Sequence, residues 1–178
     1  MKVMDRIKII LNIILAKRYI LISFQILLFI ALYLGVRGYT QRALVQDVPP
    51  MLNATFLSGE SFNLQAPFHE PRLLHFWATW CPVCKLEQDS IESISKDYSV
   101  VSIAMQSGTD IELEQYMQDE NLSFAVIADA RGTIAHRFGV KAVPVSFILN
   151  DKGNIVFTET GFTSSWGLRF RLWLADFL

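Results

Sequence analysis

Apolar positions along this chain form one long uninterrupted run followed by many short ones. The long run is residues 19–36, eighteen residues without a charged side chain. As a helix it would be roughly 27 Å long, enough to cross the hydrocarbon core of a bilayer. We therefore expect a transmembrane signal anchor at 19–36, a basic and amphipathic N-terminus at 1–18, a linker at 37–50 and a folded domain at 51–178.

The flanks of the apolar run predict its orientation. It is longer than the apolar part of a cleaved signal peptide, and no small-x-small cleavage site follows it. Its N-terminal side carries more basic residues (Lys2, Arg6, Lys8, Lys17 and Arg18) than its C-terminal side (Arg37 and Arg42). The positive-inside rule then keeps the N-terminus in the cytoplasm and places the domain outside. The apolar patch at 7–16 is too short to span and is expected to lie in the membrane interface.

The short runs predict alternating strands and helices. Strands are expected in a hairpin at 54–64 and at 73–77, 98–105, 122–128, 144–149 and 154–158, the last two joined by a tight turn at 151–153. Helical repeats follow at about 82–97, about 110–120, 133–138 and the C-terminus. The last helix is amphipathic, with one stripe of Trp166, Phe170, Trp173/Leu174 and Phe177. This order predicts an α/β fold with a mixed sheet flanked by helices on both faces.

Charge excludes one class of partner. Residues 37–178 carry eleven basic and sixteen acidic side chains, a net charge of −5. A mildly acidic domain has no electrostatic basis for binding nucleic acid.

The candidate chemistry lies where the 73–77 strand runs into a helix. Cys81 and Cys84 are the only cysteines. Cys81 is expected at the helix N-cap and Pro82 at the first helical position, which leaves the N–H groups of Val83 and Cys84 free to face the Cys81 sulfur. Both this and the helix dipole favour a thiolate, the nucleophile of thiol–disulfide exchange. Cys84 falls on the apolar helix face and is expected to be the buried, resolving thiol.

Three other readings of the cysteine pair are weaker. A structural disulfide across so short a loop would stabilise the fold by only about 2 kcal/mol. A metal site would need ligands beyond the two cysteines, and the three histidines complete no zinc spacing. Haem attachment requires His after the second cysteine, where this chain has Lys85. Redox chemistry is therefore favoured, with no bound metal or organic cofactor beyond the redox-active Cys81–Cys84 disulfide.

The segment Phe76-Trp-Ala-Thr-Trp-Cys-Pro-Val-Cys-Lys85 resembles the active-site segment of thioredoxin-fold proteins. It is most similar to the membrane-anchored TlpA-like group, and within that group to the suppressor-of-copper-sensitivity D type. The resemblance implies a thioredoxin-like fold and a single-pass protein of the inner (cytoplasmic) membrane with its domain in the periplasm. It also implies a cysteine-containing protein substrate and a membrane electron-transfer reductase that restores the dithiol.

The same resemblance assigns supporting residues. In the family the proline matching Pro144 is cis and lies beside the cysteines, and the preceding backbone, here Val143, is offered to the substrate. Trp80 would shield the Cys81 sulfur. TlpA-like reductases have a glutamate at the position of Glu87, but a solvated helix glutamate is as good an interpretation from the sequence. His75 occupies a position where many thioredoxins have a buried carboxylate, and it could be a proton relay or a neutral core histidine.

Two positions bear on the direction of the redox reaction and on the alternative functions. The dipeptide between the cysteines, Pro82-Val83, lacks the histidine that commonly stabilises the thiolate of oxidising relatives, so we expect a reductant. A cytochrome c maturation thioredoxin is the nearest alternative, but those proteins have an acidic residue after the cis-proline, where Val145 stands here. A copper-binding module using the cysteine pair is the alternative from another class, although it would lack further ligands.

Overall fold

The computed structural model describes the backbone of residues 2–178 and the side chains of residues 17–178 except Arg37, Tyr39 and Thr40. It divides into two compact units, Met1–Arg42 and Ala43–Leu178.

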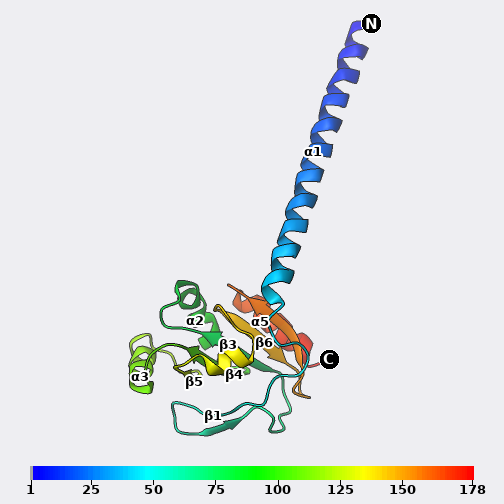
Figure 1. Cartoon of the computed structure of the whole chain (residues 1–178). Coiled ribbons are helices and arrows are strands. Elements are labelled where there is room, and N and C mark those ends of the chain that lie inside the picture. The colour runs from blue at the N-terminus through cyan, green and yellow to red at the C-terminus, as the bar shows by residue number, and fades with distance from the viewer. Residues whose placement is uncertain (1) are drawn as a thin grey trace. The chain divides into compact units, whose positions relative to one another are not determined.

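The first unit is one helix, α1 (Lys2–Gln41), coloured blue to cyan in Figure 1. Its window Lys17–Val36 has a mean hydropathy of 2.3 and no buried side chain, so its length and composition allow it to cross a membrane. The expected interfacial extension belongs to residues 1–16, whose side chains lie outside the described residues.

The stretch expected as a linker, 37–50, is divided between the helix α1 and the second unit. The helix continues to Gln41, and residues 43–50 belong to the second unit. Leu44 is buried in the core there, packed with the cluster that contains Phe138 and Val140. Val45 donates a backbone hydrogen bond to the carbonyl of Phe138 at 3.2 Å. An apolar residue so close to the predicted span is hard to assign from sequence, because its partners lie almost a hundred positions later.

The second unit is built on a five-stranded sheet in the order β5-β4-β3-β6-β7. The strands are β3 (Arg72–Trp77), β4 (Ser99–Met105), β5 (Ala125–Asp129), β6 (Val145–Leu149) and β7 (Ile155–Thr160). The central strand β3 pairs in parallel with β4 and antiparallel with β6, so the predicted mixed sheet is confirmed. A separate hairpin, β1 (Asn53–Thr55) with β2 (Ser61–Asn63), precedes it.

Side chains alternate across β3 and divide the core in two. Leu73 and Trp77 join a cluster with three helices, α2 (Pro82–Ser95), α3 (Asp110–Asp119) and α5 (Ser165–Ala175). Leu74 and Phe76 point to the other face, which is covered by α4 (Thr133–Arg137) and by residues 44–64. Helices therefore cover both faces, as predicted. Burying both faces of β3 explains why residues 73–77 are almost uniformly apolar.

Helix α5 does not pack against the sheet through its aromatic stripe. Its core contacts come from Leu168, Leu172 and Ala175, which are completely buried. The stripe lies on the opposite face and is open to solvent, with exposed fractions of 85% for Trp166, 59% for Phe170, 53% for Trp173 and 67% for Phe177. The helix has two apolar faces, and its hydrophobic repeat alone could not decide which of them meets the sheet.

Gly139 joins the start of the unit to the end of α4. Its φ is 72°, a left-handed conformation that favours glycine. A Cβ at this position would collide with the backbone carbonyl of Ala43. The residue therefore both ends α4 and lets residues 43–45 pack against it.

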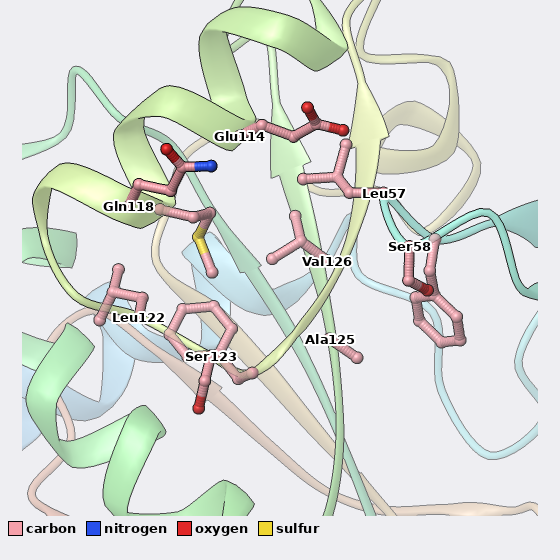
Figure 2. Close-up of a pocket in the computed structure, with 11 residues that line it drawn as sticks. Leu57, Ser58, Glu114, Gln118, Leu122, Ser123, Ala125 and Val126 are labelled. Carbon is pink, nitrogen blue, oxygen red and sulfur yellow. The ribbon is translucent and has the colours of Figure 1, made fainter.

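A cavity of about 480 Å³ lies at the outer edge of the sheet (Figure 2). Its walls come from the β1–β2 turn, from α3 and from residues 122–126 around β5. The N–H of Leu57 donates to the carbonyl of Val126 at 2.9 Å, so the turn also covers part of the edge strand. β5 is two strands away from β3, the strand that leads to the cysteine pair.

Candidate active site

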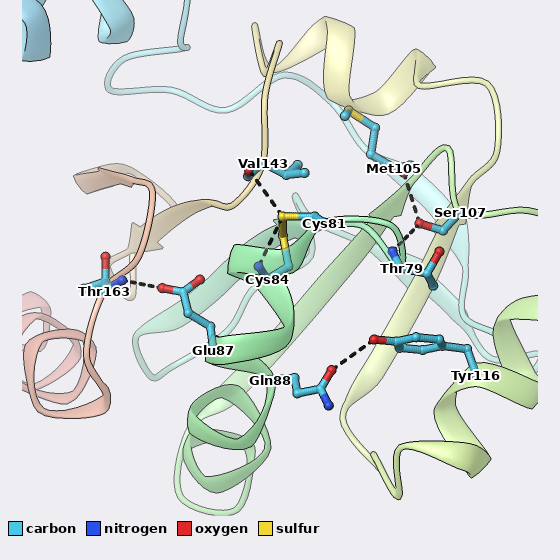
Figure 3. The surroundings of a disulfide bond; sticks show 10 residues. All are labelled: Thr79, Cys81, Cys84, Glu87, Gln88, Met105, Ser107, Tyr116, Val143 and Thr163. Atoms are coloured by element: carbon cyan, nitrogen blue, oxygen red, sulfur yellow. Dashed lines mark hydrogen bonds between the residues drawn. A yellow bond between two sulfur atoms is a disulfide. The ribbon is translucent and has the colours of Figure 1, made fainter.

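The cysteines lie where β3 turns into α2 (Figure 3). Cys81 is the N-cap and Pro82 begins the helix, which confirms the predicted cap. The backbone N–H of Cys84 donates to the Cys81 sulfur at 3.1 Å. The two residues are joined as a disulfide, with their Cα atoms 5.3 Å apart. A free helix-terminal N–H aimed at sulfur is the feature that stabilises a thiolate there after reduction.

Burial does not distinguish the two cysteines in this disulfide form. Cys81 is 4% exposed and Cys84 is 3% exposed. What distinguishes them is their neighbours, because Cys81 is the helix cap and its sulfur lies 3.6 Å from the backbone carbonyl of Val143.

That carbonyl belongs to the loop that enters β6. The peptide bond between Val143 and Pro144 is cis, and Pro144 is buried. The carbonyl of Pro144 accepts a hydrogen bond from the N–H of Gly161 at 2.9 Å. This loop, which the family resemblance predicts to contact the substrate, is thus held beside Cys81 by Gly161, in the segment between β7 and α5.

Trp80 forms part of the rim around the disulfide. Its side chain is 57% exposed, and its indole N–H donates to the carbonyl of Gln106 at 3.0 Å. Gln106 follows β4 in a left-handed conformation with a φ of 49°. Val83 and Leu86 of α2 are also exposed, at 38% and 72%. Exposed apolar side chains therefore lie on both sides of the cysteine pair in the sequence.

Glu87 is buried on the same helix, one turn after Cys84. It is 2% exposed, so the interpretation as a solvated helix glutamate is wrong. Its Oε1 accepts a hydrogen bond from the N–H of Thr163, while Oε2 has no hydrogen-bond partner among the described residues. Burial raises the pKa of Glu87 to about 7, against the opposing effect of the Thr163 bond. A carboxyl with this pKa can exchange a proton near neutral pH.

His75 lies inside the sheet, on the face of β3 that packs toward α2. It is 2% exposed, and its Nδ1 is 2.9 Å from the hydroxyl oxygen of Ser146 on the neighbouring strand β6. Burial lowers the pKa of His75 to about 4, which keeps the ring neutral at physiological pH. The burial and the Ser146 contact therefore support the interpretation of His75 as a neutral core histidine.

Several residues of the site were not predicted. Thr163 holds Glu87, and Ser107 braces the turn before Cys81: its hydroxyl accepts from the N–H of Thr79 and donates to the carbonyl of Met105, both at 3.1 Å. Each contact joins segments separated by at least 28 positions, except the local Ser107–Met105 bond. No local pattern in the sequence marks such pairs.

Metal ligands are not grouped in the described part of the chain. No set of three or more His, Cys, Asp or Glu side chains there could hold a metal ion. The arrangement is instead suited to two-electron exchange between sulfur atoms, with a proton acceptor one helical turn away.

Known proteins resemble this chain over most of its length. Residues 45–165 match the family described as Redoxin. A thioredoxin-like protein of Haemophilus influenzae is 32% identical over 145 residues, which cover 80% of this chain and 86% of that protein. Sporulation thiol-disulfide oxidoreductase A of Bacillus subtilis is 27% identical over 158 residues, covering 83% and 92%. The crystal structure of StoA from Bacillus subtilis has a TM-score of 0.61 at 25% identity, covering 69% of this chain and 96% of that one.

The match to the family spans more than half of the chain and contains every residue of the site described above. A cysteine pair at a helix N-terminus is consistent with the activity for which relatives are named, thiol–disulfide exchange. The chain belongs to the Redoxin family and is a thioredoxin-like thiol–disulfide oxidoreductase.

Proposed function

We propose that this protein is anchored in the cytoplasmic membrane by residues 17–36, faces the periplasm with its domain, and reduces disulfides of client proteins. The observation that carries the redox role is the Cys81 sulfur, which receives the Cys84 N–H at 3.1 Å and lies 3.6 Å from the Val143 carbonyl. Cys81 and Cys84 are the only cysteines of the chain, so no other cysteine pair could carry this role.

The reaction begins from the reduced dithiol. The Cys81 thiolate attacks one sulfur of a client disulfide, forms a mixed disulfide and releases the other client sulfur as a thiolate. Cys84 then loses its proton and attacks the Cys81 sulfur, which frees the second client thiolate and closes the Cys81–Cys84 disulfide. Two electrons pass to the client, and its two thiolates take up two protons. A membrane electron-transfer protein would return two electrons to the disulfide.

Glu87 is the proposed acceptor of the Cys84 proton. It follows Cys84 by three positions on α2, so the two residues share a helix face. Its pKa of about 7 allows it to take a proton from the thiol and release it to solvent afterwards. His75 has a pKa too low to hold that proton near neutral pH, so Glu87 is the better acceptor.

Reduction rather than oxidation is supported by the dipeptide between the cysteines. Pro82 and Val83 offer no side chain that stabilises the Cys81 thiolate, which leaves the helix terminus as its main support. A less stabilised thiolate gives a more reducing couple. We expect a reduction potential below about −180 mV, measured by equilibration with glutathione buffers, whereas a value near about −120 mV would indicate an oxidase.

A trapping experiment tests the client and the roles of the cysteines. In a Cys84→Ala variant the mixed disulfide cannot be resolved, so Cys81 should stay joined to a client that mass spectrometry identifies. The matched control is Cys81→Ala, which should trap little. Clients joined mainly through Cys84 in that control would contradict the assignment of Cys81 as the nucleophile.

Orientation needs its own test. The basic residues before the apolar window support a periplasmic domain. Protease added to spheroplasts should digest residues 43–178 while a cytoplasmic marker stays intact. Protection of both would show that the domain lies in the cytoplasm.

A further inference from the structure

A hollow of about 690 Å³ opens between the end of β4 and the helix α4. Four of its lining residues carry basic side chains, Arg131, His136, Arg137 and Lys141, and all four are exposed. No Asp or Glu is among the residues that line it. The domain as a whole is acidic, so this basic hollow is a local concentration of the opposite charge.

The basic hollow touches the active site on one side through Gln106. The side chain of Gln106 packs over Gly132 in the hollow, where a Cβ would come within 3.4 Å of it. The carbonyl of the same residue accepts the indole N–H of Trp80 at 3.0 Å. One residue therefore separates the hollow from the tryptophan that precedes Cys81.

The basic hollow reaches the active site on a second side through the loop before β6. Lys141 lines it, and Val143, two positions later, has its carbonyl 3.6 Å from the Cys81 sulfur. Two segments of the chain thus connect the same basic surface to the active site, one at Trp80 and the other at the Cys81 sulfur.

The positive charges are largely unmatched within the protein. Among the described residues, no ion pair involves a basic residue of the hollow, whereas Lys85, Arg169 and Arg171 are each paired with a carboxylate. Arg137 donates a hydrogen bond to the backbone carbonyl of Met51, which holds its guanidinium but does not neutralise it. A cluster of like charges that the fold does not pair costs free energy unless an anionic partner compensates it.

We propose that the basic hollow binds an acidic segment of the client polypeptide, adjacent to the client cysteine that reacts with Cys81. This rests on the proposed function. A client chain that leaves Cys81 across Val143 in extended conformation advances roughly 3.3 Å per residue, so carboxylates about two to four positions from its cysteine reach Lys141 and the hollow. Arginine and lysine bind carboxylates through charge-assisted hydrogen bonds. Each exposed ion pair is weak on its own. Several exposed charges of one sign nevertheless steer an oppositely charged partner and raise its association rate.

The test uses the full chain, reduced and held in nanodiscs of zwitterionic lipid. Its substrates are synthetic peptides with one cysteine in a mixed disulfide with a chromophoric thiol, flanked by either two aspartates or two lysines. Attack of Cys81 on the peptide sulfur releases the chromophore, whose absorbance gives the rate. We expect the aspartate peptide to react about tenfold faster at low salt, with most of the difference lost at about 0.5 M salt because the charges are then screened.

Two variants and a matched control locate the effect. The charge reversal R131E/K141E should invert the preference, and the neutral R131Q/K141Q should abolish it. The control K96E/K152E changes the net charge as much as the first variant, but it alters exposed lysines outside the hollow. It should keep the preference for the aspartate peptide.

The outcomes separate this proposal from the proposed function. Release of no chromophore from any peptide would contradict the redox role itself. Release at equal rates from both peptides, or loss of the preference in the K96E/K152E control, would overturn the role of the hollow alone. Binding of wild-type protein, but not of R131E/K141E, to phosphatidylglycerol vesicles together with equal peptide rates would overturn it in favour of a lipid headgroup site.

Discussion

Replacing Glu87 by glutamine should make the disulfide-bonded domain more stable at alkaline pH. The carboxyl is buried and only one of its oxygens has a hydrogen-bond partner among the described residues. Ionising it in that environment is costly, and the pKa of Glu87 is raised from 4.5 to about 7 by this desolvation. Glutamine keeps an oxygen for the N–H of Thr163 and cannot ionise.

The size of the effect follows from the pKa shift. Below pH 4.5 the carboxyl holds its proton in both folded and unfolded chains, so it contributes no pH dependence. Between pH 4.5 and about 7 only the unfolded chain releases the proton, and stability falls as pH rises. The full loss, reached above about pH 7, is on the order of 3 kcal/mol at 1.36 kcal/mol per pKa unit. The unpaired amide of glutamine adds an offset that does not change with pH.

Urea unfolding of the oxidised chain in mild detergent, repeated from pH 4 to pH 8, measures this directly. The free energy of unfolding of E87Q minus that of the wild type should rise by about 3 kcal/mol across the range. The control is E114Q, which replaces an exposed glutamate of α3. A difference for E87Q that stays constant with pH would refute the buried, proton-holding carboxyl.

Three further predictions test other parts of the structure. Gly139→Ala should lower the free energy of unfolding by about 2–4 kcal/mol, measured in urea, because it combines a left-handed φ with a collision against Ala43. An unchanged urea midpoint would contradict this close contact between Gly139 and Ala43. Thr109→Ala should cost about 1 kcal/mol in the same assay, because the capping box of α3 is lost, and no loss would show that the cap contributes nothing. Brief alkylation of the reduced protein near pH 6 should label Cys81 far ahead of Cys84, because only Cys81 receives the helix-terminal N–H; preferential labelling of Cys84 would reverse their roles.

The sequence predicted best what adjacent residues determine. The N-cap at Cys81 and the helix start at Pro82 depend on a few neighbouring positions, and both are confirmed. The mixed character of the sheet could also be predicted, because short apolar runs of strand length alternate with helical repeats before a final hairpin.

What the sequence left open depends on contacts between distant segments. Glu87 could not be identified as buried, because its partner Thr163 is 76 positions away. The orientation of α5 could not be decided, since both Leu168 and Trp166 lie on apolar faces and only packing against the sheet selects one. The basic hollow was missed for the same reason: His136 had no assigned role, and nothing in its local sequence shows that it lies beside Lys141.

The packing of residues 43–47 against Gly139 and its neighbours also affects how the domain responds to a mechanical force. Force pulled through the N-terminal helix enters at residues 43–47, which are tied to the domain by isolated bonds such as Val45 to Phe138 at 3.2 Å and Ile155 to Asp47 at 2.6 Å. Bonds loaded one after another break at lower force than a sheet ladder whose bonds are loaded together. A force applied through the N-terminal helix would therefore detach residues 43–47 before it separated the strands of the five-stranded sheet.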